Sequence, residues 1–307
     1  MLRVSPLVVG LILAAAARAQ SPAPTARPAN PLGRVPILEY HLITGADSRW
    51  GRSREGFRRD LELLYSRGYR PITVAQLADG AIDLPAGTSP VVVTFDDASP
   101  GQFGYLERNG KLEVDPESGV GIWMDFNRRH SDWRTRATFC LLPAASAGHA
   151  FFGDKGIDGQ QTAWRFPKLR FLAEHGFELC AHTLWHANLA TLSDAGVQEQ
   201  IARSLIAIDS AVPAQRVRTF ALPLGIWPKN RELAHAGSWR NPKSGQLVSY
   251  RFDAILEVSG GPARSPRAPG FDPLRLPRIQ VIGDNLAREL DRLEKDRYVA
   301  DGSGPKR

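Results

Sequence analysis

The chain has 307 residues, with 39 basic and 32 acidic side chains and a formal net charge of +7. The basic residues are scattered and form no stripe, which argues against nucleic acid as a partner and favours, at most, attraction to an anionic cell envelope or glycan. The length and the 43% hydrophobic content fit one large α/β domain better than two.

The first 19 residues have the pattern of a secretory signal peptide. Arg3 precedes an apolar segment from Leu7 to Ala17, and small residues surround a cleavage position after Ala19. We therefore expect an exported protein, periplasmic or secreted, without a transmembrane segment once the signal is removed. Residues 20–33 are rich in proline and predict a flexible linker, residues 34–300 a single domain, and residues 301–307 a flexible tail.

Strand and helix patterns alternate along the domain, which indicates parallel strands joined by helical crossovers. Helices are predicted for residues 54–67, 121–132, 166–175, 193–210 and 284–295, and strands for residues 35–40, 91–95, 137–142, 177–181, 217–222, 252–258 and 278–282. Seven strands in series suit a closed or nearly closed α/β barrel, and an open doubly wound sheet is the alternative because periodicity cannot show closure.

The buried strand pattern at residues 91–95 ends in two adjacent carboxylates, Asp96 and Asp97. Ligand sites of parallel sheets lie at the carboxyl ends of the strands, and two neighbouring acidic groups favour a bound cation. The alternative is that these carboxylates only cap the following turn. Cys140 and Cys180 both lie in apolar strand patterns, which favours buried free thiols over a disulfide.

Two histidines, His182 and His186, follow a later strand pattern. If the segment turns helically, residues four apart face the same way and both imidazoles reach one cation. Two nitrogens and one carboxylate oxygen are a usual ligand set for a catalytic metal with open positions for water.

With these motifs the sequence resembles the polysaccharide deacetylase family, the NodB-homology carbohydrate esterases. The matching segments are residues 94–97 and 182–186, with residues 220–225 a looser match to a third motif. The resemblance implies a distorted (β/α)7-type barrel in a single domain. It also implies a hydrolase that removes N-acetyl groups from a polysaccharide containing N-acetylglucosamine.

The resemblance assigns Asp97, His182 and His186 as metal ligands and Asp96 as general base. Zinc is the first choice of metal, with cobalt, nickel and iron as alternatives. A backbone N–H near Leu224 is implied as a donor to the developing oxyanion.

The sequence departs from the common family pattern in two motifs. Ala221 stands where an arginine usually braces the base, and the last strand carries Arg278 where a histidine usually acts as the acid. The chain resembles the branch of exported poly-β-1,6-N-acetylglucosamine deacetylases, which implies His41, at the end of the first strand, as the candidate substitute acid. The alternative is a histidine that only satisfies a backbone carbonyl. Asp253 is a candidate to orient His41 or to pair with Arg278, with a structural ion pair as the alternative, and Arg278 is a candidate brace for Asp96.

Tryptophans near the motifs are candidates to stack on sugar rings, although most tryptophans are packing residues. Trp227, on the third-motif loop, is preferred over Trp185 and Trp123. Two other functions stay open at this point: an O-acetyl esterase of the xylan type, because an alkoxide leaves more readily than an amine, and a non-catalytic glycan-binding protein that kept the fold.

Overall fold

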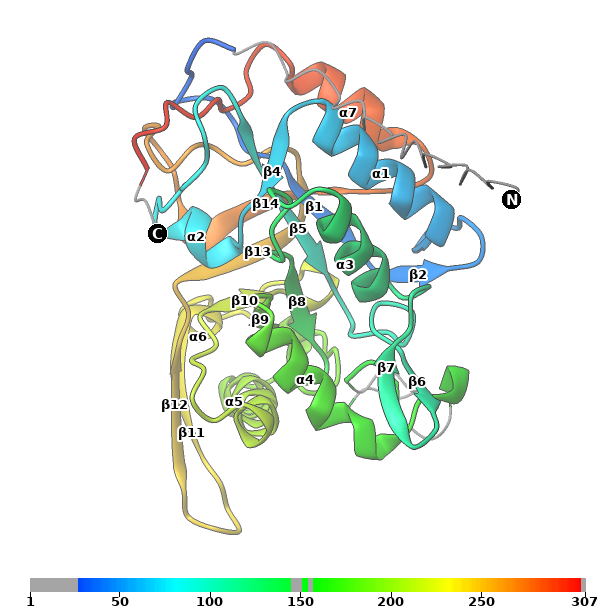
Figure 1. The fold of residues 1–307 in the computed structure, drawn as a ribbon. Coiled ribbons are helices and arrows are strands. Elements are labelled where there is room, and N and C mark those ends of the chain that lie inside the picture. Colours follow the sequence, from blue (N-terminus) through cyan, green and yellow to red (C-terminus); the bar gives the residue numbers. More distant parts are fainter. Residues whose placement is uncertain (1–26, 145–150, 154–156, 305–307) are drawn as a thin grey trace, which may run out of the picture.

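The computed structural model describes residues 27–144, 151–153 and 157–304 (Figure 1). The predicted signal peptide and the first part of the predicted linker lie outside the described residues. Within the described part of the chain, no helix is long and apolar enough to cross a membrane.

Seven parallel strands form a closed barrel, which confirms the predicted fold class. Their order is β1-β14-β13-β10-β9-β8-β5, and β5 pairs again with β1. The strands are β1 Ile37–Tyr40, β5 Ser89–Phe95, β8 Thr138–Leu141, β9 Glu178–Ala181, β10 Thr219–Ala221, β13 Ala254–Gly260 and β14 Leu276–Gln280. A short strand, β4 Tyr69–Pro71, extends the sheet beside the first half of β5.

Strand periodicity explains how the barrel interior is filled. Each of the seven strands contributes to one apolar layer, whose members are Ile37, Val92, Cys140, Cys180, Ala221, Leu256 and Leu276. Residues two positions further along a strand point to the same side. Glu39, Thr94 and Arg278 therefore lie one level closer to the carboxyl ends of the strands, and all three are buried.

The two cysteines of this layer are neighbours in register on β8 and β9. Both are buried and both are free thiols, as the sequence predicts. At the amino ends of the strands the interior is again polar: the half-buried Glu178 accepts hydrogen bonds from Thr138 (2.9 Å) and Thr219 (2.8 Å). Its carboxylate ties β8, β9 and β10 together at the end opposite the site.

Helices cover the outside of the barrel (Figure 1). The five predicted helices are α1 Arg54–Ser66, α3 Gly119–Arg129, α4 Arg165–Glu174, α5 Asp194–Ala211 and α7 Asn285–Leu293. Two shorter helices that the sequence reading missed are α2 Val74–Ala78 and α6 Glu232–His235. Outward-facing apolar residues of the strands and the apolar faces of the helices together form the larger of two cores.

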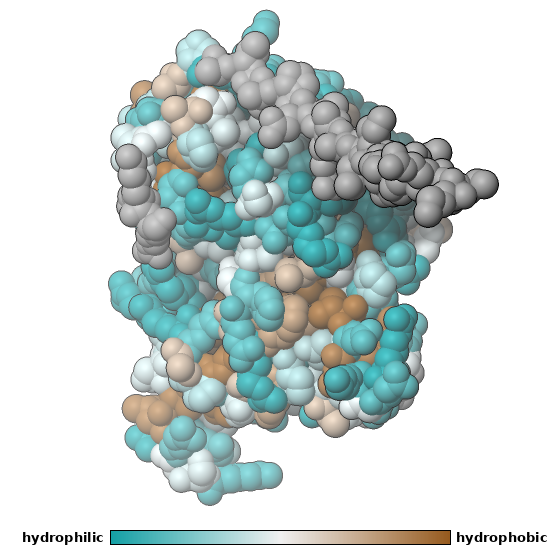
Figure 2. All heavy atoms as spheres, viewed as in Figure 1, coloured by the Kyte–Doolittle hydropathy of each residue, from teal (hydrophilic) through white to brown (hydrophobic). Residues whose placement is uncertain are grey.

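Among the described residues, three small two-stranded sheets lie outside the barrel, and none of them was predicted. They are β2 Leu42–Thr44 with β3 Gly51–Ser53, β6 Tyr105–Arg108 with β7 Lys111–Val114, and β11 Ala236–Arg240 with β12 Leu247–Arg251. The β11–β12 hairpin extends away from the body (Figure 1). Hydrophilic side chains cover most of the face shown in Figure 2, and the hydrophobic ones form small separate patches.

Both ends of the predicted domain need correction. Asn30, expected in a flexible linker, pairs through its backbone with Val299, at 2.9 and 3.1 Å. Asp301, expected at the start of a loose tail, accepts a hydrogen bond from Arg267 at 2.9 Å. Residues 30–33 and 301–304 therefore belong to the folded unit, because long-range backbone and ion-pair contacts hold segments whose composition suggests disorder.

Candidate metal and catalytic centre

Asp97, His182 and His186 meet at the carboxyl ends of β5 and β9. The Nε2 atoms of His182 and His186 lie 3.3 and 3.4 Å from the same oxygen, Oδ1 of Asp97. One ligand atom from each side chain lies within 4.8 Å of the other two. The three predicted metal ligands therefore converge from two strands.

The backbone reaches this arrangement through left-handed residues. Asp97 has φ 73°, Thr183 has φ 66° and His186 has φ 59°, values that residues other than glycine adopt rarely. The helical turn expected at residues 182–186 is wrong, because β9 ends at Ala181 and an irregular loop follows. Strained backbone of this kind occurs where a site needs side chains held in one orientation.

The cluster fits a divalent cation. Oδ1 of Asp97 is buried and has no hydrogen-bond partner among the described residues, which is costly unless a cation completes its environment. The Nδ1 atom of His182 lies 2.9 Å from the carbonyl oxygen of Ala221, so that nitrogen donates and Nε2 keeps a free lone pair towards the cluster. Two imidazole nitrogens and one carboxylate suit zinc and its neighbours in the transition series.

Asp96 is buried beside this cluster and is bound by Arg278 of β14. The Nη1 and Nη2 atoms of Arg278 donate to the two carboxylate oxygens of Asp96, both at 2.8 Å. Arg278 also donates to the hydroxyl of Thr94 (3.0 Å) and to the carbonyl of Glu257 (2.7 Å). The guanidinium is thus fixed in a bidentate geometry, as the sequence reading suggested for a brace of Asp96.

The charges around Asp96 keep its carboxylate ionised. Burial alone would raise the pKa of Asp96, but the attraction of Arg278, and then of His182 and His41, is larger and lowers the pKa well below its usual range. Asp96 is therefore ionised at any ordinary pH.

Glu39 is a member of this site that the sequence reading missed. Its Oε1 lies 2.8 Å from Nη2 of Arg278, so one buried guanidinium serves two buried carboxylates. Burial raises the pKa of Glu39 to about 8, although Arg278 opposes the shift. The available signal was the position of Glu39 two residues before His41, which puts both on the same side of β1.

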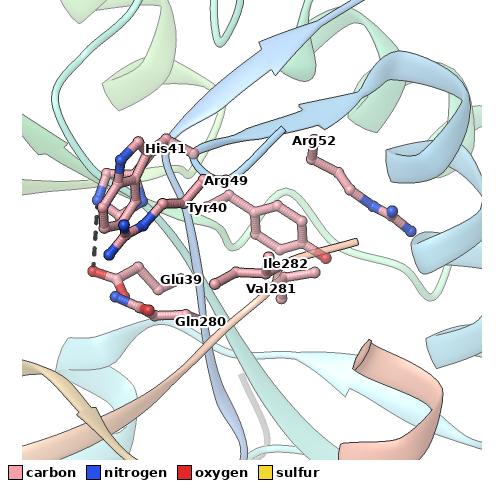
Figure 3. A pocket seen from close by; sticks show the side chains of 9 residues that line it. Glu39, Tyr40, His41, Arg49, Arg52, Gln280, Val281 and Ile282 are labelled. Carbon is pink, nitrogen blue, oxygen red and sulfur yellow. Dashed lines mark ion pairs between the residues drawn. The ribbon is translucent and has the colours of Figure 1, made fainter. Parts of the chain in front are cut away.

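His41 follows β1 and completes the centre. Its Nε2 lies 3.9 Å from Oε1 of Glu39 (Figure 3). Ligand atoms of Glu39, His41 and Asp96 lie within 4.8 Å of one another. Burial lowers the pKa of His41, and the carboxylates of Asp96 and Asp97 oppose that shift. The amide nitrogen of Gln102 donates to the carbonyl oxygens of His41 and Asp96, which ties the ends of β1 and β5 together.

Asp253 does not belong to this centre, and its predicted supporting role is wrong. It precedes β13 and so lies at the amino end of that strand, whereas the site lies at the carboxyl ends. It accepts hydrogen bonds from Arg218 (2.6 Å) and Arg216 (3.1 Å). The structural ion pair considered as the alternative is the one observed.

The residues predicted to bind substrate lie in the loop after β10. Leu224 has φ 59° and is 52% exposed. Trp227 is half-buried, and its Nε1 donates to a carboxylate oxygen of Glu257 at 3.1 Å. Trp123 is buried in the core and is excluded as a sugar-stacking residue, whereas Trp185 is 52% exposed.

The arrangement supplies the groups that hydrolysis of an acyl bond needs. A divalent cation bound by Asp97, His182 and His186 supplies Lewis-acid activation of a water and of a carbonyl oxygen. Asp96 is an ionised carboxylate next to that position, suited to removing a proton from an attacking water. His41, on the neighbouring strand, is an imidazole able to give a proton to a leaving group.

Comparison with known proteins agrees with this chemistry. Residues 133–237 match the family described as polysaccharide deacetylase, a segment that contains His182, His186 and the third motif. His41, Asp96 and Asp97 lie before this segment in the chain. The folded barrel brings Asp97 next to His182 and His186. No curated protein matches the chain.

Solved structures of deacetylases share the fold. The Streptococcus pyogenes deacetylase PplD in complex with acetate is 16% identical, with 85% of this chain and 98% of that chain covered and a TM-score of 0.57. IcaB from Ammonifex degensii is 16% identical, with 85% and 97% covered and a TM-score of 0.56. A polysaccharide deacetylase from Bacillus cereus is 14% identical, with 85% and 69% covered and a TM-score of 0.58.

Proposed function

We propose that the protein removes N-acetyl groups from a polysaccharide containing N-acetylglucosamine, starting from the match of residues 133–237 to the polysaccharide deacetylase family. The observation that carries the proposal is the convergence of a three-ligand metal cluster, an ionised Asp96 and the imidazole of His41 at one end of the barrel.

In the proposed reaction Asp96 takes a proton from the water that attacks the acetyl carbonyl. Arg278 keeps Asp96 ionised and oriented through its two hydrogen bonds. His41 then gives a proton to the leaving nitrogen, because an amine leaves poorly unless it is protonated. The backbone N–H of Leu224 is the proposed donor to the oxyanion, at the end of a strand that neighbours β9.

The metal bound by the chain is proposed to be zinc, with cobalt, nickel and iron as alternatives, since the ligand set suits all four. The polysaccharide is proposed to be extracellular or part of the cell envelope, which agrees with the secretory pattern of residues 1–19 and with export of the protein to the periplasm or beyond.

The observed geometry weakens the view that the protein only binds glycans. That view drew on the missing third-motif arginine at Ala221, but Arg278 brings a guanidinium to Asp96 from a different strand. Arg278 therefore takes the place of the arginine that is missing at position 221, and the proposed base, Asp96, has a guanidinium partner.

The test is acetate release by the metal-loaded protein from N-acetylglucosamine oligomers and from O-acetylated xylan, measured in parallel. The proposal expects release from the N-acetyl substrate and a loss of at least about 100-fold in Asp97→Asn and His182→Ala, because both remove metal ligands. Circular dichroism and metal content of each variant separate a lost metal from a lost fold.

Release from the O-acetyl substrate alone would replace this function by the ester hydrolase. Oligomer binding without any acetate release, in a sample shown to contain the metal, would replace it by the glycan-binding protein.

A further inference from the structure

One buried glutamine joins the backbones of the proposed acid and the proposed base. The Nε2 atom of Gln102 donates to the carbonyl oxygen of His41 and to that of Asp96, and the side chain is fully buried. A primary amide has two N–H donors, and because both partners are carbonyl oxygens, they fix which way the amide group is turned. Gln102 therefore bridges the chain at the ends of β1 and β5.

This bridge begins where the strand pairing stops. The pairing of β1 with β5 ends at Tyr40, whose carbonyl accepts a hydrogen bond from the backbone N–H of Asp96 at 2.9 Å. His41 follows Tyr40 and lies outside the strand ladder. Its carbonyl is held by the Gln102 amide, and the hydroxyl oxygen of Ser99 lies 3.5 Å from it. The place of His41 relative to Asp96 therefore depends on a side chain and not on the sheet alone.

The loop that carries Gln102 lies directly against this part of the chain. The carbonyl of Gln102 accepts a hydrogen bond from the backbone N–H of Val120 at 2.8 Å, in the first turn of α3. A Cβ atom on Gly101 would lie 2.0 Å from the carbonyl oxygen of Ile43 in β2. Only glycine allows the two backbones to approach so closely. The loop is thus fixed on both sides, and the amide of Gln102 is held in place.

The ring of His41 has few other restraints. Its Nε2 lies 3.9 Å from Oε1 of Glu39, which is too far for a hydrogen bond (Figure 3). The ring of Trp50 meets it edge to face, with the centroids 5.1 Å apart. The carboxylate of Asp96, in contrast, is held by two hydrogen bonds of 2.8 Å from Arg278. A shift of the backbone between β1 and β5 would therefore displace His41 more than the carboxylate of Asp96.

We propose that Gln102 is a positioning residue that sets the distance between His41 and Asp96. The inference rests on the proposed function, in which these two residues act on the same acetyl group as acid and base. Displacement of a reacting group by about 1 Å can lower a rate by about 100-fold. The Oε1 atom of Gln102 is buried and has no hydrogen-bond partner among the described residues. Such an oxygen is a cost, which the two bonds from Nε2 offset.

The test compares the zinc-loaded wild type and Gln102→Met on an N-acetylglucosamine pentamer. Methionine has a similar length and volume but no donor, so the protein should fold without the bridge. We expect kcat to fall by at least about 10-fold and KM to change by less than about 2-fold, because the groups that bind substrate are all retained. Circular dichroism and metal content check the fold and the metal. An unchanged kcat, or a change in KM alone, would overturn the positioning role.

Gln160→Met is the matched control. Gln160 is also a buried glutamine, and its amide bonds the backbone of Tyr105 on β6, outside the barrel, at 2.9 and 3.1 Å. This variant loses the same kind of hydrogen bonds without touching the proposed centre, so its kcat should stay near that of the wild type. An equal fall of kcat in both variants would mean that Gln102 acts only through stability.

The effect of Gln102 should also depend on the presence of His41. In a His41→Ala background there is no acid left to place, so Gln102→Met should lower kcat by at most about 2-fold further. A further fall as large as that in the wild-type background would contradict positioning of His41.

Nuclear magnetic resonance of the zinc-loaded protein with ¹³C-labelled histidine gives a readout that needs no turnover. The ring signal of His41 is identified by its absence in His41→Ala. We expect it to shift in Gln102→Met and to stay in place in Gln160→Met. This shift would support the bridge even if the wild type released no acetate and the proposed function failed. An unchanged His41 signal in Gln102→Met would overturn the bridge itself.

Discussion

Arg278 contacts two buried carboxyl groups, those of Asp96 and Glu39, with one guanidinium. Strand position alone suggested that it could brace Asp96, and the two 2.8 Å hydrogen bonds confirm the contact. Its second carboxylate partner, Glu39, was not predicted: strand alternation puts Glu39 on the same side as His41, but it does not show that this side faces a closed interior. The supporting role of Asp253 was wrong for a different reason: the strand predicted at residues 252–258 already puts Asp253 at an amino end, whereas the site lies at the carboxyl ends.

Replacing Arg278 by Met should destabilise the protein strongly. It leaves the ionised Asp96 without its cation and the carboxyl group of Glu39 without its partner, and breaking a buried ion pair on one side costs about 3–5 kcal/mol. Urea unfolding at neutral pH measures this loss. Glu39→Gln is the matched control, since Arg278 keeps Asp96 and the expected loss is much smaller.

The same ion pair has a definite pH dependence. Because the folded-state pKa of Asp96 is lowered, its contribution to stability is present above the unfolded pKa near 3.9 and is lost as the pH falls through the folded value. The wild type should therefore keep this contribution down to about pH 4, whereas Arg278→Met should lack it throughout. The account would be contradicted if the free energy of unfolding fell by the same amount in both proteins as the pH is lowered below about 4.

At the scale of elements, the regular parts of the fold were predictable and the small sheets were not. Buried strands and amphipathic helices carry their own periodicity, so seven strands and five helices were located to within a few residues. The β11–β12 hairpin has no such pattern, because its residues are mostly exposed or half-exposed and it is held by packing on α5. The loop at residues 182–186 was predicted wrongly, since spacing of four residues does not distinguish a helical turn from a left-handed one.

Helix α5 provides a test at this scale. Ser193 caps it by accepting a hydrogen bond from the backbone N–H of Gly196 at 3.2 Å. Ser193→Ala should lower the free energy of unfolding by about 1 kcal/mol, and Ser193→Asp should retain most of the cap. Denaturant titration measures both. A loss of the same size in Ser193→Asp would show that the serine acts through something other than its cap.

At the scale of the whole molecule, the sequence could favour a barrel but not show its closure. Closure rests on the pairing of β1 with both β5 and β14, contacts between residues far apart in the chain. The same kind of contact holds Asn30 against Val299, where composition alone predicts a linker. Pairing between distant strands also brings the carboxyl ends of β1, β5 and β9, where His41, Asp96, Asp97 and His182 lie, to the same end of the barrel.

A buried lysine makes the stability of the whole domain depend on pH. Lys168 of α4 is fully buried and donates to the carbonyl of Phe152 (2.8 Å) and to Gln160 (2.6 Å), and burial lowers its pKa to about 7. Between pH 7 and the unfolded value near 10.4 the unfolded chain binds more protons, so stability should rise with pH by up to about 1.4 kcal/mol per unit. In Lys168→Met this rise should disappear, and an unchanged slope would contradict the assignment.

The central claim is that Asp96 and His41 act as base and acid beside a metal, and a leaving-group comparison tests it most directly. The wild type and His41→Ala, both metal-loaded, would be assayed on an N-acetylglucosamine oligomer and on 4-nitrophenyl acetate, whose leaving group needs no proton. The account predicts a fall of at least about 100-fold on the oligomer and a change of only a few-fold on the ester. Equal losses on both substrates, or no loss on the oligomer, would contradict the role of His41 as the acid.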